Sequence, residues 1–262
     1  MFGRTISRVL KSVLDFRNYL SIAKANFVYT NILEDFIQGY ILQVGKYPCY
    51  LYLKTPLGIQ SIELLNSLDT FTVNEIFCWE IYYINREPKV IVDFGSNIGV
   101  SEIYFLTRND KNIVYGFEPV PQLYQQLEKN TAGFASRVFN QNFAVDVESG
   151  MANMGIEQSG RYGGIGLIQE SQITVKTIAA DLALKQILDV HKQIDLLKID
   201  IEGVEERVLN SLDVNVLSKI KCIYVESGAN DKLMPQNLKQ LFQLFSHRGI
   251  CKYVNTTLIE SI

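Results

Sequence analysis

At 262 residues the chain is long enough for one sizeable α/β domain and an N-terminal extension, but short for two full-size domains. Hydrophobic residues make up 47% of it and charged residues 20%, a composition that excludes a disordered or fibrous protein. Its formal net charge of -3 gives no general attraction to polyanions, so no nucleic-acid partner is expected.

The four cysteines are widely spaced and lack the C-x-x-C pattern of zinc or dithiol sites, so we interpret Cys49, Cys78, Cys222 and Cys251 as reduced thiols. No apolar run reaches the length of a membrane span, and the N-terminus lacks the pattern of a cleaved signal peptide. These features predict a cytoplasmic protein without a transmembrane segment.

Residues 2–40 carry apolar side chains at helical spacing, such as Phe2 and Ile6, with Arg4 and Arg8 between them. This pattern predicts an amphipathic helix. Its apolar stripe is suited to packing on its own domain, to a homodimer contact or to a peripheral contact with an anionic membrane. The sequence leaves these three partners open.

Residues 50–59 alternate around a Thr-Pro-Leu-Gly turn signal and predict a β-hairpin, and residues 72–84 predict a second helix. The run Arg86-Glu87-Pro88 then interrupts the pattern. We therefore expect an N-terminal helical and hairpin extension over residues 1–85 and the main domain over residues 86–262.

From residue 90 onward, strand and helix patterns alternate, which is typical of a parallel sheet. Strands are expected at 90–94, 113–117, 194–199 and 222–226, and helices at 101–107, 122–129, 204–212 and 238–247. A hairpin-like strand pair is expected near residues 251–259. The sequence therefore predicts an α/β fold with a doubly wound, mostly parallel sheet and helices on both faces.

A glycine loop follows the first of these strands. Gly95 and Gly99 lie at its carboxyl end, where open α/β sheets bind ligands and where glycine permits close backbone approach. The spacing departs from the G-x-G-x-x-G of dinucleotide sites and fits S-adenosylmethionine better. The next strand ends at Glu118-Pro119, and its carboxylate suits either the two ribose hydroxyls or the start of a helix.

The run Asp93-Phe94-Gly95-Ser96-Asn97-Ile98-Gly99, with Ser101, resembles the first motif of the FkbM family of methyltransferases. Later motifs of that family follow in order as Phe117-Glu118-Pro119, Ala144-Val145-Asp146 and the run DLLKIDIEGVE at residues 195–205. The resemblance implies a Rossmann-like class I methyltransferase fold and S-adenosylmethionine as the methyl donor. It also implies O-methylation of a hydroxyl on a sugar, a glycan or a related small-molecule acceptor.

We expect the cofactor to be bound at the carboxyl edge of the sheet by Asp93, Gly95, Ser96, Asn97, Gly99, Ser101, Glu118, Pro119, Asn142, Phe143, Ala144 and Asp200. Residues 142–145 are expected to end the third strand and to pass near the adenine.

Asp200 and Glu226, with Glu202, are the candidate catalytic residues. If their strands are neighbours, one carboxylate can take a proton from the acceptor hydroxyl while the other orients the substrate. Two carboxylates could also hold a divalent cation such as Mg²⁺, and the sequence does not choose between these mechanisms, so no metal ligand is assigned. Acids in a first helical turn are also common caps, which is our interpretation of Glu205.

Other polar residues have weaker claims. Lys198 lies in an apolar strand and is interpreted as a support of the site, and His191 in a predicted loop and His247 near a predicted helix end are given no role. The glycine-rich residues 159–166 suit a loop over the acceptor or a surface excursion. The rival functions are a nicotinamide-dependent oxidoreductase or epimerase and a scaffold without turnover.

Overall fold

The computed structural model describes residues 16–83, 90–156, 163–165, 171–226, 235–247 and 250–258. The chain forms two compact units, one comprising residues up to Tyr83 with Thr107–Asp110 and the other the remainder. The predicted boundary between residues 85 and 86 lies outside the described residues and stays a prediction.

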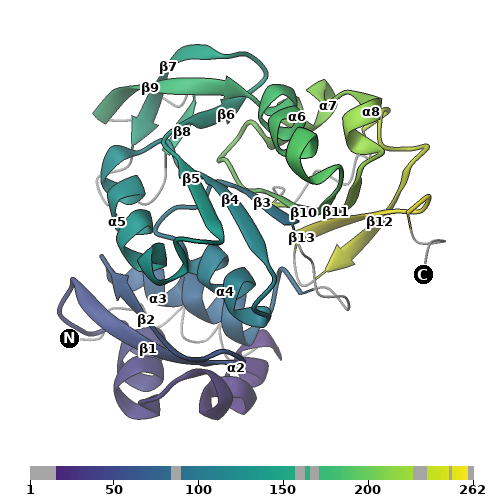
Figure 1. Ribbon diagram of the computed structural model, residues 1–262. Helices are drawn as coiled ribbons and strands as arrows, with labels where there is room; N and C mark the ends of the chain where they lie inside the picture. The colour runs from purple at the N-terminus through teal and green to yellow at the C-terminus, as the bar shows by residue number, and fades with distance from the viewer. Residues whose placement is uncertain are drawn as a thin grey trace. The chain divides into compact units, whose positions relative to one another are not determined.

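The first unit combines short helices with a two-stranded hairpin (Figure 1). Its elements are α2 (Phe16–Val28), the π-helix η1 (Ile32–Ile41), β1 (Cys49–Thr55), β2 (Gly58–Leu64), α3 (Ser67–Val73) and the π-helix η2 (Asn74–Cys78). The predicted hairpin is confirmed, with Thr55 paired to Gly58 at its turn.

Both helices predicted in this unit have wrong bounds. Residues 1–15 lie outside the described residues, and the helix predicted over 2–40 is interrupted after Val28, because Asn31 begins a separate helix by accepting a hydrogen bond from the Glu34 N–H at 3.2 Å. The helix predicted over 72–84 begins earlier, at Ser67, where the preceding Asn66 forms a capping box.

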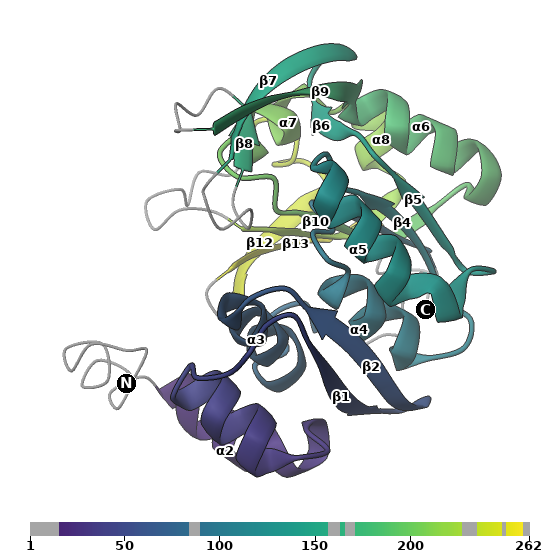
Figure 2. The same ribbon diagram turned by 90° about the vertical axis from the view of Figure 1, so that its left-hand side faces the viewer.

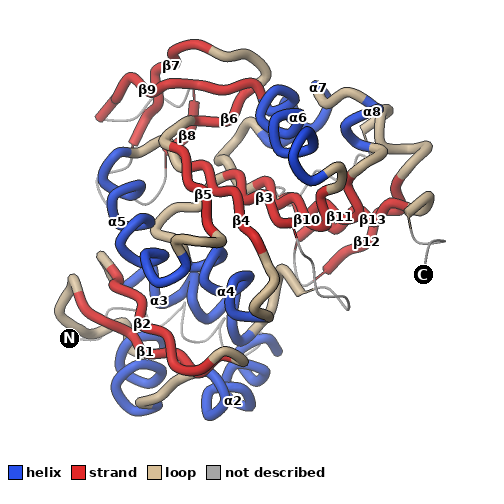
Figure 3. Tube along the Cα trace, in the orientation of Figure 1, coloured by secondary structure: helices blue, strands red, loops and turns tan. Residues whose placement is uncertain are grey.

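The second unit is built on a seven-stranded sheet in the order β12-β13-β11-β10-β3-β4-β5 (Figure 3). Its strands are β3 (Val90–Phe94), β4 (Ile113–Phe117), β5 (Val138–Gln141), β10 (Ile194–Ile199), β11 (Ile220–Val225), β12 (Phe242–His247) and β13 (Ile250–Asn255). Five neighbouring strands run parallel, while β13 is antiparallel to both β11 and β12. The chain order reverses between β3 and β10, which makes the sheet doubly wound and confirms the predicted fold class.

Helices cover both faces of this sheet, as Figures 1 and 2 show. They are α4 (Val100–Arg108), α5 (Pro121–Thr131), α6 (Ala180–His191), α7 (Glu205–Ser211) and α8 (Val214–Leu217), with a 3-10 turn η3 (Ala132–Phe134) after α5. Helices α6, α7 and α8 share a buried apolar core with Val92, Phe94 and Ile199, whereas α4 and α5 lie on the opposite face. Apolar burial on this face fixes the strand ends that form the site.

A second, four-stranded sheet was not predicted. It has the order β6-β9-β7-β8 and comprises β6 (Ala144–Asp146), β7 (Gly150–Ile156), β8 (Gly163–Ile165) and β9 (Ser171–Ala179). Residues 163–165 of the predicted glycine-rich loop therefore form an edge strand, and residues 159–162 and 166 lie outside the described residues.

The helix predicted over residues 238–247 is wrong. Residues 242–247 form β12, which pairs antiparallel with β13, so the predicted hairpin-like strand pair exists but occupies residues 242–255 rather than 251–259. Leu238 and Phe242 are spaced as on a helix, but pairing with β13 overrides the local pattern.

Candidate functional site

Four strands of the parallel sheet end in register. The last residues of β3, β4, β10 and β11 are paired with one another across the sheet. The residues that follow therefore lie in a row at one edge, in the order Glu118, Gly95, Asp200 and Glu226. As predicted, the glycine loop and the candidate carboxylates are brought together at the carboxyl edge, where such sheets bind ligands.

The loop after β3 is held by hydrogen bonds that its backbone N–H groups donate within the loop and to the end of β4. Each N–H group from residue 95 to residue 99 donates a hydrogen bond within the chain: Gly95 and Ser96 to the Phe117 carbonyl at 3.0 Å each, Asn97 to Glu118 Oε2 at 2.9 Å, Ile98 to Asn97 Oδ1 at 2.7 Å and Gly99 to the Ser96 carbonyl at 2.9 Å. None of these five N–H groups is left to bind an anion.

The two loop glycines serve close approach of the chain to itself. A Cβ on Gly95, whose φ is +87°, would lie 1.8 Å from the backbone oxygen of Asp200. A Cβ on Gly99, whose φ is +90°, would lie 2.8 Å from Leu127 Cδ1. Both positions therefore need glycine for conformation and for space, and their predicted contact with a cofactor stays a prediction.

Below the loop lies a buried ion pair. Asp93 is fully buried, its Oδ1 accepts a hydrogen bond from Lys198 Nζ at 2.8 Å, and its Oδ2 accepts one from the Ser101 hydroxyl. Lys198 Nζ also donates to the Gly95 carbonyl at 2.9 Å and lies 3.4 Å from Asp200 Oδ2. Asp93 and Ser101 therefore anchor the loop from inside, and Lys198 supports the site.

The charge of Lys198 is stabilised by its neighbours. Burial opposes that charge, but the carboxylates of Asp93, Asp200 and Glu226 outweigh it and raise the pKa of Lys198 above its ordinary value. Lys198 is thus a fixed cation between one buried carboxylate and two at the edge of the sheet.

Glu118 accepts hydrogen bonds at the start of α5, one of the two roles that the sequence left open, and its contact with ribose hydroxyls stays a prediction. Its Oε1 accepts a hydrogen bond from the Val120 N–H at 2.8 Å, just before α5 begins at Pro121, and its Oε2 accepts one from the Asn97 N–H at 2.9 Å. The residue is 4% exposed, and burial raises the pKa of its carboxyl to about 7. A carboxylate oxygen has two lone pairs, so each can accept a further donor from a ligand.

The segment after β5 differs from the prediction. The third strand ends at Gln141, and Ala144 begins β6 of the second sheet, because a turn places the Phe143 N–H 3.0 Å from the Gln141 carbonyl. Asn142 Nδ2 donates to the carbonyls of Glu118 and Pro119 at 2.8 and 3.0 Å. Phe143 is half-buried and Ala144 is buried, so Asn142 holds the loop after β4, and an adenine contact stays a prediction.

The candidate catalytic carboxylates are more accessible. The side chain of Asp200 is 24% exposed, Glu226 is exposed, and the Glu226 N–H donates to the carbonyl of the last β10 residue at 3.0 Å. Glu202 has a φ of +53°, a sparsely populated conformation that is frequent at functional sites. Glu205 accepts hydrogen bonds from the N–H groups of Ile201 and Gly203 at 3.0 and 2.8 Å, in agreement with a capping role.

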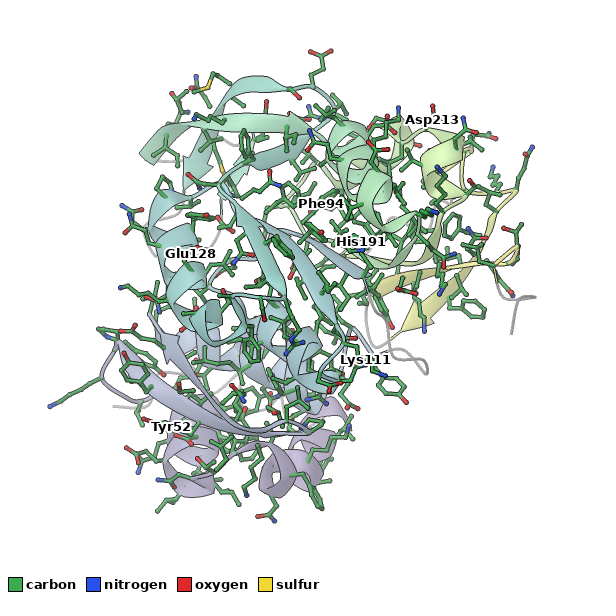
Figure 4. All side chains as sticks on the ribbon, in the orientation of Figure 1. Tyr52, Phe94, Lys111, Glu128, His191 and Asp213 are labelled. Atoms are coloured by element: carbon green, nitrogen blue, oxygen red, sulfur yellow. The ribbon has the colours of Figure 1, made fainter. Side chains whose placement is uncertain are left out.

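The remaining candidates lie elsewhere. Among the described residues, no group of three or more His, Cys, Asp and Glu side chains is placed to hold a metal ion. The four cysteines are free thiols. His191, labelled in Figure 4, is the last residue of α6 rather than part of a loop, and its Nε2 lies 2.7 Å from Tyr115 Oη. His247 ends β12 rather than a helix. In the part of the chain that the structure describes, no helix is long and apolar enough to cross a membrane.

One buried residue near the site escaped the sequence analysis. Glu102, on α4, is fully buried on the face of the sheet that carries Asp93. The available signals were a glutamate followed by the apolar run of residues 103–106 in α4 and a glycine within β4, Gly116.

The strand order, the single reversed strand β13 next to β11, and the glycine loop beside an acidic strand end define a class I methyltransferase fold. A sequence profile described as the Methyltransferase FkbM domain matches residues 93–250, more than half of the chain. The chain therefore belongs to the FkbM family and is a methyltransferase.

Individual relatives are distant. Methyltransferase sdnD of Sordaria araneosa is 24% identical over 213 residues, which cover 63% of this chain and 77% of that protein. The AMB antimetabolite synthetase AmbE of Pseudomonas aeruginosa is 25% identical over 218 residues, covering 68% of this chain but 10% of the synthetase. Among solved structures, a methyltransferase from Geobacter sulfurreducens matches with a TM-score of 0.36 and 13% identity, over 64% of this chain and 72% of that one.

Proposed function

We propose that the chain is an S-adenosylmethionine-dependent O-methyltransferase whose acceptor is a hydroxyl of a sugar, a glycan or a related small molecule. The observation that carries the choice of cofactor is the internal hydrogen bonding of all five N–H groups of residues 95–99. A dinucleotide needs free N–H groups at this loop to bind its pyrophosphate, so the nicotinamide alternative loses its main contact.

The chemistry of the edge suits S-adenosylmethionine. Its sulfonium and amino groups are cationic and its ribose hydroxyls are donors, and the row contains the carboxyl groups of Glu118, Asp200 and Glu226. Glu118 would bind the ribose hydroxyls through its remaining lone pairs, and Asp200 would face a cationic group. The internal bonding of the N–H groups of residues 95–99 and the presence of three acidic groups support the same ligand.

We assign the proton transfer to Glu226. Lys198 lies 3.4 Å from Asp200 Oδ2 and would hold that carboxylate as an orienting anion. When bound, the cofactor supplies an activated methyl group that departs from its sulfur. Glu226, exposed at the edge, would accept the proton of the acceptor hydroxyl as the new oxygen–carbon bond forms. A divalent cation held by Asp200 and Glu226 is the alternative way to activate the hydroxyl.

Calorimetric titration with S-adenosylmethionine, S-adenosylhomocysteine and NAD⁺ tests the cofactor. Micromolar binding of the first two, lost in Asp93→Ala and kept in the exposed control Glu128→Ala, is the expected result (Figure 4 labels Glu128). If only NAD⁺ binds, the proposal is wrong. Binding of S-adenosylmethionine without turnover on any acceptor would favour the scaffold function.

Transfer of a labelled methyl group to hydroxylated acceptors tests the chemistry. We expect Glu226→Gln to lower kcat by about 100-fold or more with little change in cofactor affinity. Loss of activity in chelator, restored by Mg²⁺, would replace general-base catalysis with metal activation. A contact of the predicted N-terminal helix with a membrane or a second copy remains a separate proposal, because residues 1–15 lie outside the described residues.

A further inference from the structure

Glu102 is a buried acid that the proposed reaction does not use. It lies on α4 and is fully buried, and neither of its carboxyl oxygens has a hydrogen-bond partner among the described residues. An ionised carboxylate in such a place is very unfavourable. The chain must therefore hold this group in a particular protonation state.

The position of Glu102 is built into the sheet. Lys198, Asp93, Gly116 and Asn140 are paired in register across β10, β3, β4 and β5 and so share one face, the face of α4. A Cβ on Gly116 would lie 1.8 Å from Glu102 Oε1 and 2.4 Å from Asn140 Oδ1. Glu102 thus fills, from the helix, the space that the glycine leaves in a row of buried polar side chains.

The hydrogen bonds of Asn140 fix which of its atoms faces this space. The Thr131 hydroxyl donates to the Leu127 carbonyl at 2.8 Å, so it accepts at 3.2 Å from Asn140 Nδ2. Asn140 Oδ1 is then left toward Glu102, and it too has no partner among the described residues. A carboxylate here would set two acceptors against each other, whereas a protonated carboxyl would supply the missing donor.

The charge balance of the row favours the same state. Lys198 is already paired with Asp93 at 2.8 Å and with Asp200 at 3.4 Å, so its charge is compensated without a further anion. Burial, and after it the charge of Asp93, raise the pKa of Glu102 well above its ordinary value and outweigh the opposing effects of Ser96, Asn140 and Lys198.

We propose that Glu102 is a permanently neutral carboxylic acid that donates a hydrogen bond to Asn140 and thereby positions the loop of residues 95–99 through Ser96. The Ser96 hydroxyl donates to the Asp93 carbonyl at 3.1 Å and accepts from the Phe117 N–H at 3.2 Å. A Cβ on Gly116 would lie 2.8 Å from Ser96 Oγ as well as 1.8 Å from Glu102 Oε1. The Ser96 hydroxyl therefore lies beside the Glu102 carboxyl. The positioning role rests on the proposed function, because that loop is the predicted cofactor site.

Two substitutions separate a neutral acid from an ionised one. Glu102→Gln keeps an N–H donor for Asn140 at every pH, so the melting temperature should stay within about 2 °C of wild type and the dissociation constant of S-adenosylmethionine within about threefold. Glu102→Met removes the donor and should lower the melting temperature by about 4 °C and weaken binding about tenfold. The exposed control Glu128→Gln should change neither.

Infrared difference spectroscopy then reads the proton directly. At about pH 9, the spectrum of wild type minus Glu102→Gln should show the carbonyl band of a protonated carboxylic acid. A carboxylate band in its place, or a large gain of stability in Glu102→Gln, would overturn the proposal, even if Glu102→Met does not fold. If wild type binds no S-adenosylmethionine, the proposed function fails, while the infrared band still decides the state of Glu102.

Discussion

Protonation of Glu118 should make cofactor affinity depend on pH. Burial raises the pKa of this carboxyl from its ordinary value of 4.5 to about 7, so near pH 7 about half of the molecules carry the proton. Ribose hydroxyls are donors and need the ionised carboxylate, so binding must expel that proton. The dissociation constant for S-adenosylmethionine should fall about tenfold per pH unit up to about pH 7 and level off above it.

The assay is calorimetric titration between about pH 5.5 and about pH 9, in buffers with different heats of ionisation. At about pH 6 binding should release close to one proton, and Glu118→Gln should abolish both the release and the pH dependence. Glu128→Gln is the matched control, since Glu128 is exposed on α5, the helix that follows Glu118. An affinity that does not change over this range would refute the ribose role of Glu118.

The same proton contributes to folding stability. Because the folded-state pKa of Glu118 lies above its unfolded value, the contribution is complete below about pH 4.5 and is lost as the pH rises through about 7. The shift corresponds to about 3 kcal/mol for this group alone. Urea denaturation of wild type should therefore show a loss of stability over this window that Glu118→Gln lacks.

Two further pairs of variants test the loop and the ion pair. Gly95→Ala places a Cβ 1.8 Å from a backbone oxygen and should cost more than about 3 kcal/mol, whereas Gly99→Ala meets a side-chain methyl at 2.8 Å and should cost less, as urea denaturation would show. Lys198→Met leaves Asp93 buried without its cation and should cost about 3–5 kcal/mol, against under about 1 kcal/mol for the part-exposed Lys221→Met. Equal costs within either pair would contradict the assigned contacts.

The central strands could be predicted from the sequence because their residues are buried on both faces. Residues 90–94, 113–117 and 194–199 are mostly apolar, with few charged interruptions such as Asp93 and Lys198, and the structure places strands at these bounds. The row of residues at the carboxyl edge followed from the same runs, since parallel neighbours that end in register bring their next residues together. Because these strands are buried, their apolar character could be recognised in the sequence.

Edge elements could not be predicted in the same way. Strand β12 is the outermost strand of its sheet, and its apolar residues have a spacing that also suits a helix, so only the pairing with β13 decides its conformation. The second sheet contains a three-residue strand, β8, and such short elements carry too little periodicity to be recognised.

The structural reason for the two loop glycines could not be predicted from the motif. The sequence placed Gly95 and Gly99 correctly at the carboxyl edge and gave a ligand as the reason for glycine, and the structure adds the Asp200 carbonyl and the Leu127 side chain as close neighbours. The same substitution would be harmful under either interpretation. Their neighbours depend on the packing of β10 and α5, which a local motif does not encode.

These contacts imply that the loop is preformed. Its five N–H groups are bonded within the chain, its first carbonyl accepts from Lys198 at 2.9 Å, and Asp93 anchors that lysine from below. Ligand binding then needs no ordering of this backbone, because the conformational entropy of the loop is already lost when the protein folds. Substitutions at the exposed carboxylate of Glu226 should therefore change affinity or turnover with little change in stability, whereas substitutions at Asp93 or Lys198 should change both together.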